Sequence, residues 1–361
     1  MKNSFGNAIN ISLFGESHGA GVGVLIDGIA PGIKVDEDFI AHQLTLRRPA
    51  GKISTARREP DEYVIQSGVY NGYTTGAPLC IFIPNTDTRS RDYTPDLPRP
   101  SHADFTAREK YHGFEDYRGG GHFSGRLTAA LVAAGAIVIP ALREKGIYIG
   151  TYIKEIGQII LGAEEHTAQS LLAVAESEYG LTDPHAVDLM NQVIENAREH
   201  CDSVGGVLET AIVGLPAGLG EPWFDGVESQ IARAVFGIPA VKSVAFGADR
   251  ITVMSGKNAN DEFVIRDGRI VTATNNSGGV QGGITNGMPV VFRTAIKPTP
   301  SISQTQKTVN MATGEETELN ISGRHDPCIV QRARIVVDSV AALVVADMLT
   351  VRYGSDALTQ K

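Results

Sequence analysis

The feature that most constrains the fold of this chain is the clustering of its glycines. The 361 residues include 40 glycines, roughly 11% against a usual frequency of about 7%. They follow no three-residue period, which excludes a collagen-like chain, and many of them gather at 15–23, 119–125, 278–283 and 323. Glycine has no side chain and adopts left-handed backbone angles freely, so these clusters predict tight loops that let the backbone approach a ligand.

Between the glycine clusters, apolar periodicity predicts a mixed fold with a large core. With 42% hydrophobic and 20% charged residues, the chain is not of a disordered type. The predicted helices are 127–145, 171–179, 184–197 and 335–350, and the predicted strands are 21–28, 206–213, 241–253 and 288–296. Residues 262–273 predict a hairpin that turns at Asp267 and Gly268. No Pro/Ser-rich linker divides the chain, so we expect residues 1–361 to form one domain of α+β or α/β class, with layered sheets and helices.

One pattern of strand, glycine turn and helix occurs twice. It begins at residue 21 and again at residue 206, and Gly28 and Gly214 hold matching positions. In the first copy, Asp36 is the expected N-cap of the helix. The repeat predicts either an internal duplication or a chance similarity of two such units.

The distribution of charge predicts a basic pocket in an acidic protein. The net charge of −9 argues against a general nucleic-acid-binding protein. Residues 47–126, however, hold ten arginines and two lysines against ten acidic residues. A basic region inside an acidic chain suits a small polyanionic ligand.

The cysteines and the N-terminus indicate the compartment. Cys80, Cys201 and Cys328 are widely spaced and form no CxxC pair, which is typical of a reducing environment. The N-terminus has no signal-peptide pattern. The longest apolar stretch, 127–142, has sixteen residues and is too short to cross a bilayer. We therefore expect a cytoplasmic protein that does not contact membranes.

Two polar clusters in the N-terminal part are candidates for a site. Residues 15–19 place Ser17 and His18 directly after an apolar segment, where an imidazole can act as acid or base near neutral pH. The segment 47–61 is rich in arginine, whose fork binds phosphate and carboxylate groups. The alternatives are a surface turn with an idle histidine and a solvated charged loop.

Two further clusters extend the candidate site. Residues 99–128 combine three histidines, four arginines and three successive glycines ahead of a predicted helix, an arrangement that can hold a phosphate at the helix N-terminus. The last cluster comprises 277–283, 297–301 and 323–328, and the alternative here is a set of ordinary turns. His325, Asp326 and Cys328 lack a second compact pair of ligands, so no metal site is predicted. Together the clusters predict chemistry on a phosphorylated carboxylate, with histidines as acids and Asp326 as a base.

In their order along the chain, these motifs resemble the chorismate synthase family. The matching segments are Gly15-Glu-Ser-His-Gly19, Arg47-Arg48-Pro49, Arg57-Arg58-Glu-Pro-Asp61, Arg99-Pro-Ser-His-Ala-Asp104, Asp116-Tyr-Arg-Gly-Gly-Gly121, Pro216-Ala-Gly-Leu-Gly-Glu-Pro222, Ser277-Gly-Gly-Val-Gln-Gly-Gly283, Lys297-Pro-Thr-Pro-Ser301 and Gly323-Arg-His-Asp-Pro-Cys328. Any one of these motifs is weak, but the ordered set is specific and covers nearly the whole chain.

The resemblance implies a fold, a reaction and partners. The fold would be a layered β-α-β sandwich, usually assembled as a homotetramer. The enzyme would be a carbon–oxygen lyase of the shikimate pathway, which leads to the aromatic amino acids. It would convert 5-enolpyruvylshikimate 3-phosphate to chorismate and phosphate by a 1,4-anti elimination that needs reduced FMN. An external flavin reductase would supply the reduced flavin, with NADPH as a candidate indirect source of electrons.

The resemblance also implies roles for individual residues. His18 would protonate the phosphate side of the substrate, His102 would protonate the reduced flavin, and Asp326 would act as a base, with Ser17 and Ser124 assisting proton relay. The positions matched to the anionic substrate are Arg47, Arg48, Lys52, Arg57, Arg99 and Arg126. The positions matched to flavin contacts are His122, Phe123, Ser124, Ala240, Gly282, Lys297, Pro298, Thr299, Pro300, Ser301 and Arg324.

One segment departs from the family pattern. Residues 122–128 read His-Phe-Ser-Gly-Arg-Leu-Thr, where the family commonly has Arg-Ser-Ser-Ala-Arg-Glu-Thr. This leaves backbone contacts to the flavin open at His122 and Phe123. The alternative function is a non-catalytic flavin- or polyanion-binding protein of the same fold, and a third is a phosphate lyase that needs no flavin.

Overall fold

The computed structural model describes residues 2–48, 60–86, 94–161, 165–321 and 326–359. The first of two large sheets contains β1 (Ser4–Phe5), β2 (Asn10–Gly15), β3 (Gly21–Asp27), β4 (Val64–Ser67) and β7 (Leu79–Pro84). The second contains β8 (Tyr148–Ile156), β9 (Ile159–Ile160), β10 (Gly206–Val213), β11 (Val241–Phe246) and β16 (Val290–Ile296).

The α-helices and four small hairpins complete the described α-helices and strands. The helices are α1 (Glu37–Arg47), α2 (Asp104–Tyr111), α3 (Thr128–Glu144), α4 (Ala168–Glu176), α5 (Pro184–Glu199), α6 (Val227–Val235), α7 (Gly256–Ala259) and α8 (Val330–Tyr353). The hairpins pair β5 (Val69–Tyr70) with β6 (Tyr73–Thr74), β12 (Phe263–Arg266) with β13 (Arg269–Thr272), β14 (Val280–Gln281) with β15 (Ile284–Thr285), and β17 (Gln306–Asn310) with β18 (Glu315–Leu319).

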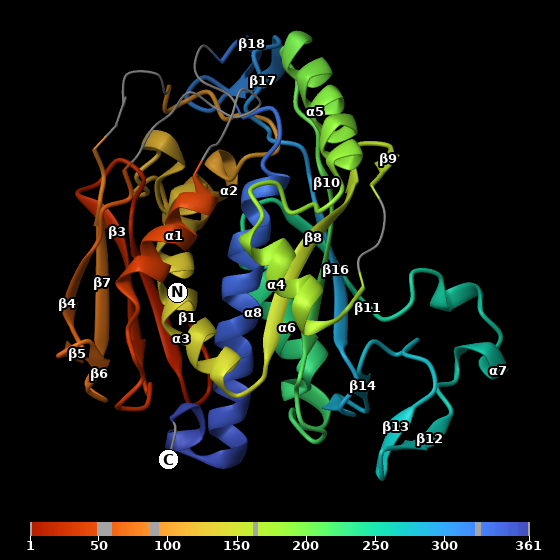
Figure 1. Cartoon of the computed structure of the whole chain (residues 1–361). Coiled ribbons are helices and arrows are strands. Elements are labelled where there is room, and N and C mark those ends of the chain that lie inside the picture. The colour runs from red at the N-terminus through yellow and green to blue at the C-terminus, as the bar shows by residue number, and fades with distance from the viewer. Residues whose placement is uncertain (1, 49–59, 87–93, 162–164, 322–325, 360–361) are drawn as a thin grey trace.

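The two large sheets enclose a layer of helices, so the architecture is a β-α-β sandwich (Figure 1). Helices α1, α3, α6 and α8 lie between the sheets, and α3 packs along α8. A Cβ on Gly135 of α3 would lie 2.4 Å from Cβ of Ser339 in α8, so only glycine permits this close crossing. The predicted layered α+β fold is confirmed.

The two halves of the chain repeat one order of elements. The first half runs β2, β3, α1, β4, β7, α3, and the second runs β8, β10, α6, β11, β16, α8. Corresponding strands occupy corresponding places in the two sheets, with the orders β2-β3-β7-β4 and β8-β10-β16-β11. Gly28 and Gly214 have φ angles of 85° and 83°, and a Cβ on them would lie 2.1 Å from O of Ala8 and 2.0 Å from O of Gly146. An internal duplication explains this match better than a chance similarity of two short units.

The apolar segment before the middle of the chain forms a core helix. Residues Gly125–Glu144 are long and apolar enough to cross a membrane by length and composition, but 83% of the apolar window is buried inside the protein. This helical segment is longer than the apolar stretch 127–142 because it also includes a short 3-10 turn that begins at Gly125 and the charged residues Arg143 and Glu144. Its apolar character is therefore explained by packing against α8 and the sheets.

Most predicted elements are confirmed, and one is wrong in part. Asp36 caps α1 by accepting a hydrogen bond from N of Phe39 at 2.9 Å. The strand predicted for 241–253 ends at Phe246. There Gly247 adopts φ of 73°, and a Cβ on it would lie 2.1 Å from O of Asn276, so the chain turns away from the sheet.

Two glycines of the 15–23 cluster serve packing and not ligand binding. The rings of Phe14 and Phe82 stack with centroids 6.5 Å apart. A Cβ on Gly21 would lie 2.4 Å from Cζ of Phe82, and one on Gly23 would lie 2.3 Å from Cζ of Phe14. The expectation that this whole cluster approaches a ligand is thus wrong for the part in β3.

Candidate active site

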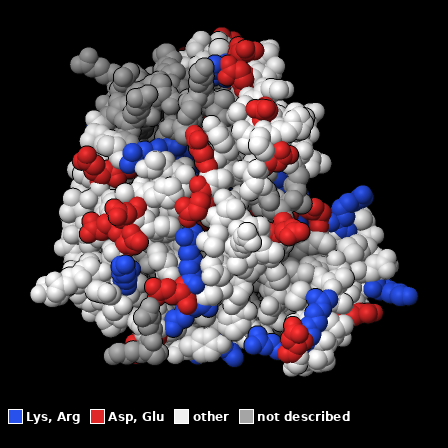
Figure 2. Space-filling model, viewed as in Figure 1, with Lys and Arg blue, Asp and Glu red and all other residues white. Residues whose placement is uncertain are grey.

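A cavity of about 930 Å³ lies where α1 ends and where α3 and α8 begin. Its polar lining includes cationic side chains from α1, from the loop before α2 and from the segment before α3. Its apolar lining includes Phe5, Ile11, Leu13, Leu131 and Leu343. On the molecular face in Figure 2, acidic and basic side chains are interspersed, whereas Arg47 and Arg126 in the cavity are only 4% and 5% exposed. The predicted basic pocket is therefore an internal feature.

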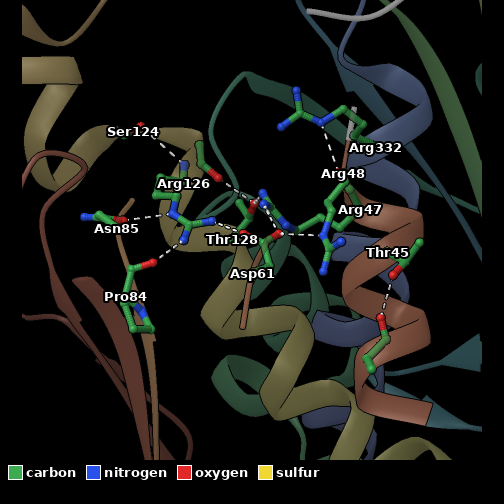
Figure 3. Close-up of polar contacts among 12 residues, drawn as sticks. Thr45, Arg47, Arg48, Asp61, Pro84, Asn85, Ser124, Arg126, Thr128 and Arg332 are labelled. Carbon is green, nitrogen blue, oxygen red and sulfur yellow. Dashed lines mark hydrogen bonds and ion pairs between the residues drawn. The ribbon is translucent and has the colours of Figure 1, made fainter. Parts of the chain in front are cut away.

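Asp61 and the three arginines around it form a unit that we call the Asp61 cluster (Figure 3). Nη2 of Arg47 donates to Oδ2 of Asp61 at 2.8 Å, and Nη1 of Arg126 donates to Oδ1. Nε of Arg48 lies 3.7 Å from Oδ2. Burial acts to raise the pKa of Asp61, but Arg47 and Arg126 outweigh it and lower that pKa. Asp61 is therefore an ionised counter-charge for the arginines.

The remaining contacts of the cluster hold its arginines in place. Arg126 donates from Nε to Oδ1 of Asn85 and from Nη2 to O of Pro84, both at 3.0 Å (Figure 3). Burial lowers the pKa of Arg47 to about 10, which leaves its guanidinium protonated at neutral pH. Nε of Arg47 and Nε of Arg48 are buried and lack a hydrogen-bond partner among the described residues. These two buried donors therefore lack the hydrogen-bond partner that buried polar groups usually have.

A second buried carboxylate, Asp326, lies on the cavity wall with Arg332, and we call these two residues the Asp326 pair. Nη1 of Arg332 donates to Oδ2 of Asp326, and Nε of Arg332 donates to O of Arg47 at 3.1 Å (Figure 3 shows the second contact). Oδ1 of Asp326 is buried and has no hydrogen-bond partner among the described residues. Burial raises the pKa of Asp326, and Arg332 only partly offsets this. A carboxylate with a raised pKa and one unused oxygen is suited to accept a proton.

The three successive glycines at 119–121 bring the two predicted catalytic histidines to one place. Their φ angles are 61°, 82° and 53°, all left-handed. A Cβ on Gly119 would lie 2.5 Å from Nε2 of His18 and 3.0 Å from Oγ of Ser17, and a Cβ on Gly120 would lie 3.2 Å from Nε2 of His102. Both imidazoles therefore rest against adjacent backbone units that only glycine can supply.

His102 belongs to a hydrogen-bonded group with two neighbours in its own motif. Its Nδ1 lies 2.6 Å from Oδ1 of Asp104, and Arg99 donates to both oxygens of Asp104 at 2.8 Å. Burial acts to raise the pKa of Asp104, but the hydrogen bonds from Arg99 and His102 outweigh it and hold that pKa far below its usual range. Arg99, predicted as a substrate contact, is thus already engaged by a carboxylate.

The segment that departs from the family pattern also lines the cavity. Nδ1 of His122 contacts O of Gly15 at 2.8 Å, so this side chain ties the segment to β2. Phe123 is 38% exposed, and its ring packs edge-on against Tyr111. Oγ of Ser124 accepts a hydrogen bond from N of Arg126 at 3.3 Å. None of these contacts prevents the backbone from meeting a ligand.

Most other predicted flavin contacts line the same cavity, namely Ala240, Lys297, Thr299, Pro300 and Ser301. Ala240 adopts a left-handed φ of 72°, and Nζ of Lys297 donates to O of Ser101 at 2.6 Å. Oγ1 of Thr299 is buried without a partner among the described residues.

The remaining predicted residues do not line the cavity. His18 and Ser17 are not part of the lining, and they lie next to it against Gly119, which is. Pro298 neighbours the lining but is not part of it, and Gly282 lies in the turn between β14 and β15 and does not line it. Lys52, Arg57 and Arg324 lie outside the described residues. Within the described part of the chain, no three His, Cys, Asp or Glu side chains are grouped to hold a metal ion.

Sequence reasoning missed the roles of Asp61, Asp104 and Arg332. The first two stand in quoted motifs, Arg-Arg-Glu-Pro-Asp and Ser-His-Ala-Asp, where a carboxylate beside cationic residues was the available signal. Arg332 stands in the first turn of α8, two residues before the buried Arg334, and this pair of arginines at the start of a mostly apolar helix was the signal for it.

Comparisons with known proteins identify the family. The family model for chorismate synthase matches residues 9–350. The chorismate synthase of Pyrococcus abyssi is 48% identical over 350 residues, which are 96% of this chain and 97% of that one. The chorismate synthase of Chitinophaga pinensis is 46% identical over 357 residues, or 98% of each chain. A crystal structure of chorismate synthase superposes with a TM-score of 0.77 at 30% identity and covers 97% of this chain and 94% of that one. The chain therefore belongs to the chorismate synthase family.

Proposed function

We propose that this enzyme is a carbon–oxygen lyase that eliminates phosphate from 5-enolpyruvylshikimate 3-phosphate and forms chorismate, in a 1,4-anti elimination that requires reduced FMN. In this role it would serve the shikimate pathway and aromatic amino-acid biosynthesis. Family membership supports the proposal. The observation that carries it is one cavity whose lining includes buried arginines and a buried carboxylate, Asp326, with one oxygen that lacks a hydrogen-bond partner among the described residues.

The charges of the substrate fit the cation-rich wall. The substrate carries one phosphate and two carboxylates, and Arg47, Arg48 and Arg126 are gathered on one side of the cavity. Forked guanidinium donors bind such groups with charge-assisted hydrogen bonds. Because Asp61 holds these arginines before any ligand arrives, little rearrangement is needed on binding.

The cavity also suits FMN. Its volume of about 930 Å³ is large for one small ligand, and ligand sites typically span roughly 300–1,000 Å³. One wall is apolar, as a flavin ring requires, and the polar wall includes Lys297 and Thr299, whose buried Oγ1 lacks a partner among the described residues. Ser124, Ala240, Lys297, Thr299 and Ser301 would hold the cofactor. The chemistry that reduced FMN would supply there is electron transfer to the substrate.

The proton chemistry is assigned to residues of this chain. His18 would act as an acid on the phosphate side of the substrate, and His102 would act as an acid toward the cofactor. Oδ1 of Asp326 would act as the base, while Arg332 holds Oδ2. A raised pKa makes Asp326 a better proton acceptor near neutral pH than an ordinary aspartate.

The assembly, the location and the electron supply are inferred from the family resemblance. We infer a cytoplasmic homotetramer that receives reduced flavin from a separate reductase, with NADPH as the indirect electron source. The three cysteines form no disulfide, which is consistent with a reducing compartment. Light scattering of the purified chain tests the tetramer, since a monomeric mass would contradict it.

An anaerobic assay of phosphate release tests the function. The substrate is incubated with the enzyme with and without reduced FMN, and phosphate and chorismate are measured together. We expect both products in equal amounts, and only with reduced FMN. Absence of both products would favour a non-catalytic binding protein, and equal release without flavin would favour a lyase that needs none.

A further inference from the structure

We propose that Asp104 is a positioning residue that fixes which ring nitrogen of His102 carries a proton, so that Nε2 is the nitrogen presented to the cavity. The expected effect on turnover rests on the proposed function, whereas the assignment of the protonated ring nitrogen does not. Its geometric basis is the group formed by His102, Asp104 and Arg99.

The protonation state of Asp104 sets the direction of the hydrogen bond to His102. Oδ1 of Asp104 lies 2.6 Å from Nδ1 of His102. The pKa of Asp104 is held far below its usual range, because hydrogen bonds from Arg99 and His102 outweigh the effect of burial. An ionised carboxylate can only accept, so Nδ1 of His102 must carry the proton and donate it. In the neutral ring, Nε2 is then the acceptor, and when His102 acts as an acid the doubly protonated ring donates its proton from Nε2.

Arg99 holds the carboxylate in place. It donates from its backbone N at 2.9 Å and from Nε at 2.8 Å to Oδ2, and from Nη2 at 2.8 Å to Oδ1 of Asp104. Nη2 of Arg99 also lies 3.0 Å from Nδ1 of His102. Both of these nitrogens carry protons, so the two donors share Oδ1 and do not bond to each other. Arg99 therefore supports Asp104, which supports His102.

The opposite edge of the imidazole is fixed by backbone. A Cβ on Gly120 would lie 3.0 Å from Cε1 and 3.2 Å from Nε2 of His102. The ring is thus confined between the Asp104 carboxylate and the Gly120 backbone, and His102 lines the cavity. Nζ of Lys297 donates to O of Ser101 at 2.6 Å and so anchors the residue next to His102.

Asp104→Asn keeps nearly the same side-chain shape but replaces a charged acceptor by an amide that can also donate a hydrogen bond. The amide can present an N–H to Nδ1 of His102, and Nη2 of Arg99 is a second donor 3.0 Å from the same atom. With only donors around it, Nδ1 becomes an acceptor, and the proton moves to Nε2. We expect the tautomer of His102 to invert and kcat to fall about 100-fold, since loss of the correct tautomer is costly in histidine-dependent enzymes. The KM for substrate should change less than about threefold.

The test uses the full-length protein with ¹⁵N-labelled histidine. Ring-nitrogen NMR shifts report which nitrogen is protonated, and His102→Gln assigns the signal. The matched control is Asp96→Asn, because Asp96 also pairs with an arginine, Arg108 at 3.0 Å, and has no hydrogen bond to a histidine within the described part of the chain. Asp104→Ala is the second variant, and circular dichroism checks the fold of all of them.

The expected result is an Nδ1-protonated ring in the wild type and in Asp96→Asn, and an Nε2-protonated ring in Asp104→Asn. In Asp104→Ala the Nδ1–H form should also be lost. An unchanged tautomer in both Asp104 variants overturns the proposal, whatever happens to turnover. If the tautomer changes in the Asp104 variants but the wild-type protein shows no flavin-dependent turnover, the proposed function is rejected and the positioning role stands.

Discussion

The Asp61 cluster and the Asp326 pair place two buried carboxylates beside one cavity, and their pKa values shift in opposite directions. Asp61 is 2% exposed and Asp326 is 7% exposed, so burial disfavours the charge of both. Two arginines occupy both oxygens of Asp61 and lower its pKa. Arg332 engages one oxygen of Asp326 and does not prevent burial from raising its pKa.

This difference indicates different roles for two similar side chains. A carboxylate whose oxygens are all engaged organises the arginines, because protonating or moving it would leave several buried charges unpaired. A carboxylate with one unused oxygen and a raised pKa can take up a proton. We therefore expect Asp61 to act mainly on stability and substrate binding, and Asp326 to act on the chemical step.

The largest expected effect is on turnover of Asp326→Asn. Removing a general base lowers the rate by about 10²–10⁴-fold, while the free energy of unfolding should stay within about 1 kcal/mol, because the raised pKa shows that the site disfavours the charge. Anaerobic product formation and urea denaturation measure the two quantities. Turnover within about tenfold of the wild type would show that Asp326 is not the catalytic base.

Asp61→Asn should cause the largest loss of stability. The change leaves Arg47 and Arg126 buried without their counter-charge, and breaking a buried pair in this way costs about 3–5 kcal/mol. Urea denaturation measures the loss. The control is Glu195→Gln, because Glu195 pairs with Arg198 on the exposed surface of α5, where such pairs contribute roughly 0–1 kcal/mol. Equal losses in the two variants would show that Asp61 is not the organising charge.

The pH dependence of stability should separate the two carboxylates further. The pKa of Asp61 is lower in the folded protein, so its contribution is present above the unfolded pKa of about 3.9 and is lost as pH falls through the folded pKa. The pKa of Asp326 is raised, so its contribution is present below about 3.9 and is lost as pH rises through the folded pKa.

Denaturation at several pH values between 3 and 7 measures these trends. The stability gap between wild type and Asp61→Asn should narrow on acidification. Asp326→Asn should gain stability relative to wild type as pH rises, because the amide has no charge to bury when the carboxyl group of the wild type ionises. If the unfolding free energies of the two variants changed with pH in the same way, Asp61 and Asp326 would not have pKa values shifted in opposite directions.

The smallest effect is expected for Arg48→Ala. The guanidinium of Arg48 lies 3.7 Å from Asp61, and its side chain is 33% exposed, so it is the least engaged arginine of the cluster. We expect substrate affinity to fall about tenfold, or about 1.4 kcal/mol, with a smaller change in FMN affinity. Separate titrations of the two ligands measure this, and Arg108→Ala is the control for loss of an exposed arginine. An equal loss for both ligands would contradict a substrate-specific role.

Much of the fold could be predicted from local patterns. Apolar periodicity located the long core helices, and the matched turns at Gly28 and Gly214 pointed to the repeated strand order that the two sheets display. The strand predicted beyond Phe246 was wrong, because the left-handed turn at Gly247 depends on the approach of Asn276, which is distant in sequence.

The candidate site could be predicted as a set of residues but not as a set of pairs. Motif resemblance located His18, His102 and Asp326 in sequence, yet it could not show that Arg126 meets Asp61 across 65 positions of the chain. Nor could it show that Arg332 engages Asp326, because that contact depends on where α8 begins relative to the loop before it. Which charged side chains neutralise each other depends on the three-dimensional fold. The structure was therefore needed to distinguish Asp61, which organises arginines, from Asp326, which is placed to accept a proton.

That division is tested most directly by single-turnover rates of Asp61→Asn and Asp326→Asn at saturating substrate and reduced FMN, corrected for the fraction of folded protein. We predict that Asp61→Asn stays within about tenfold of the wild-type rate and that Asp326→Asn falls at least about 100-fold. Comparable losses in the two variants, or a larger loss in Asp61→Asn, would contradict the assignment.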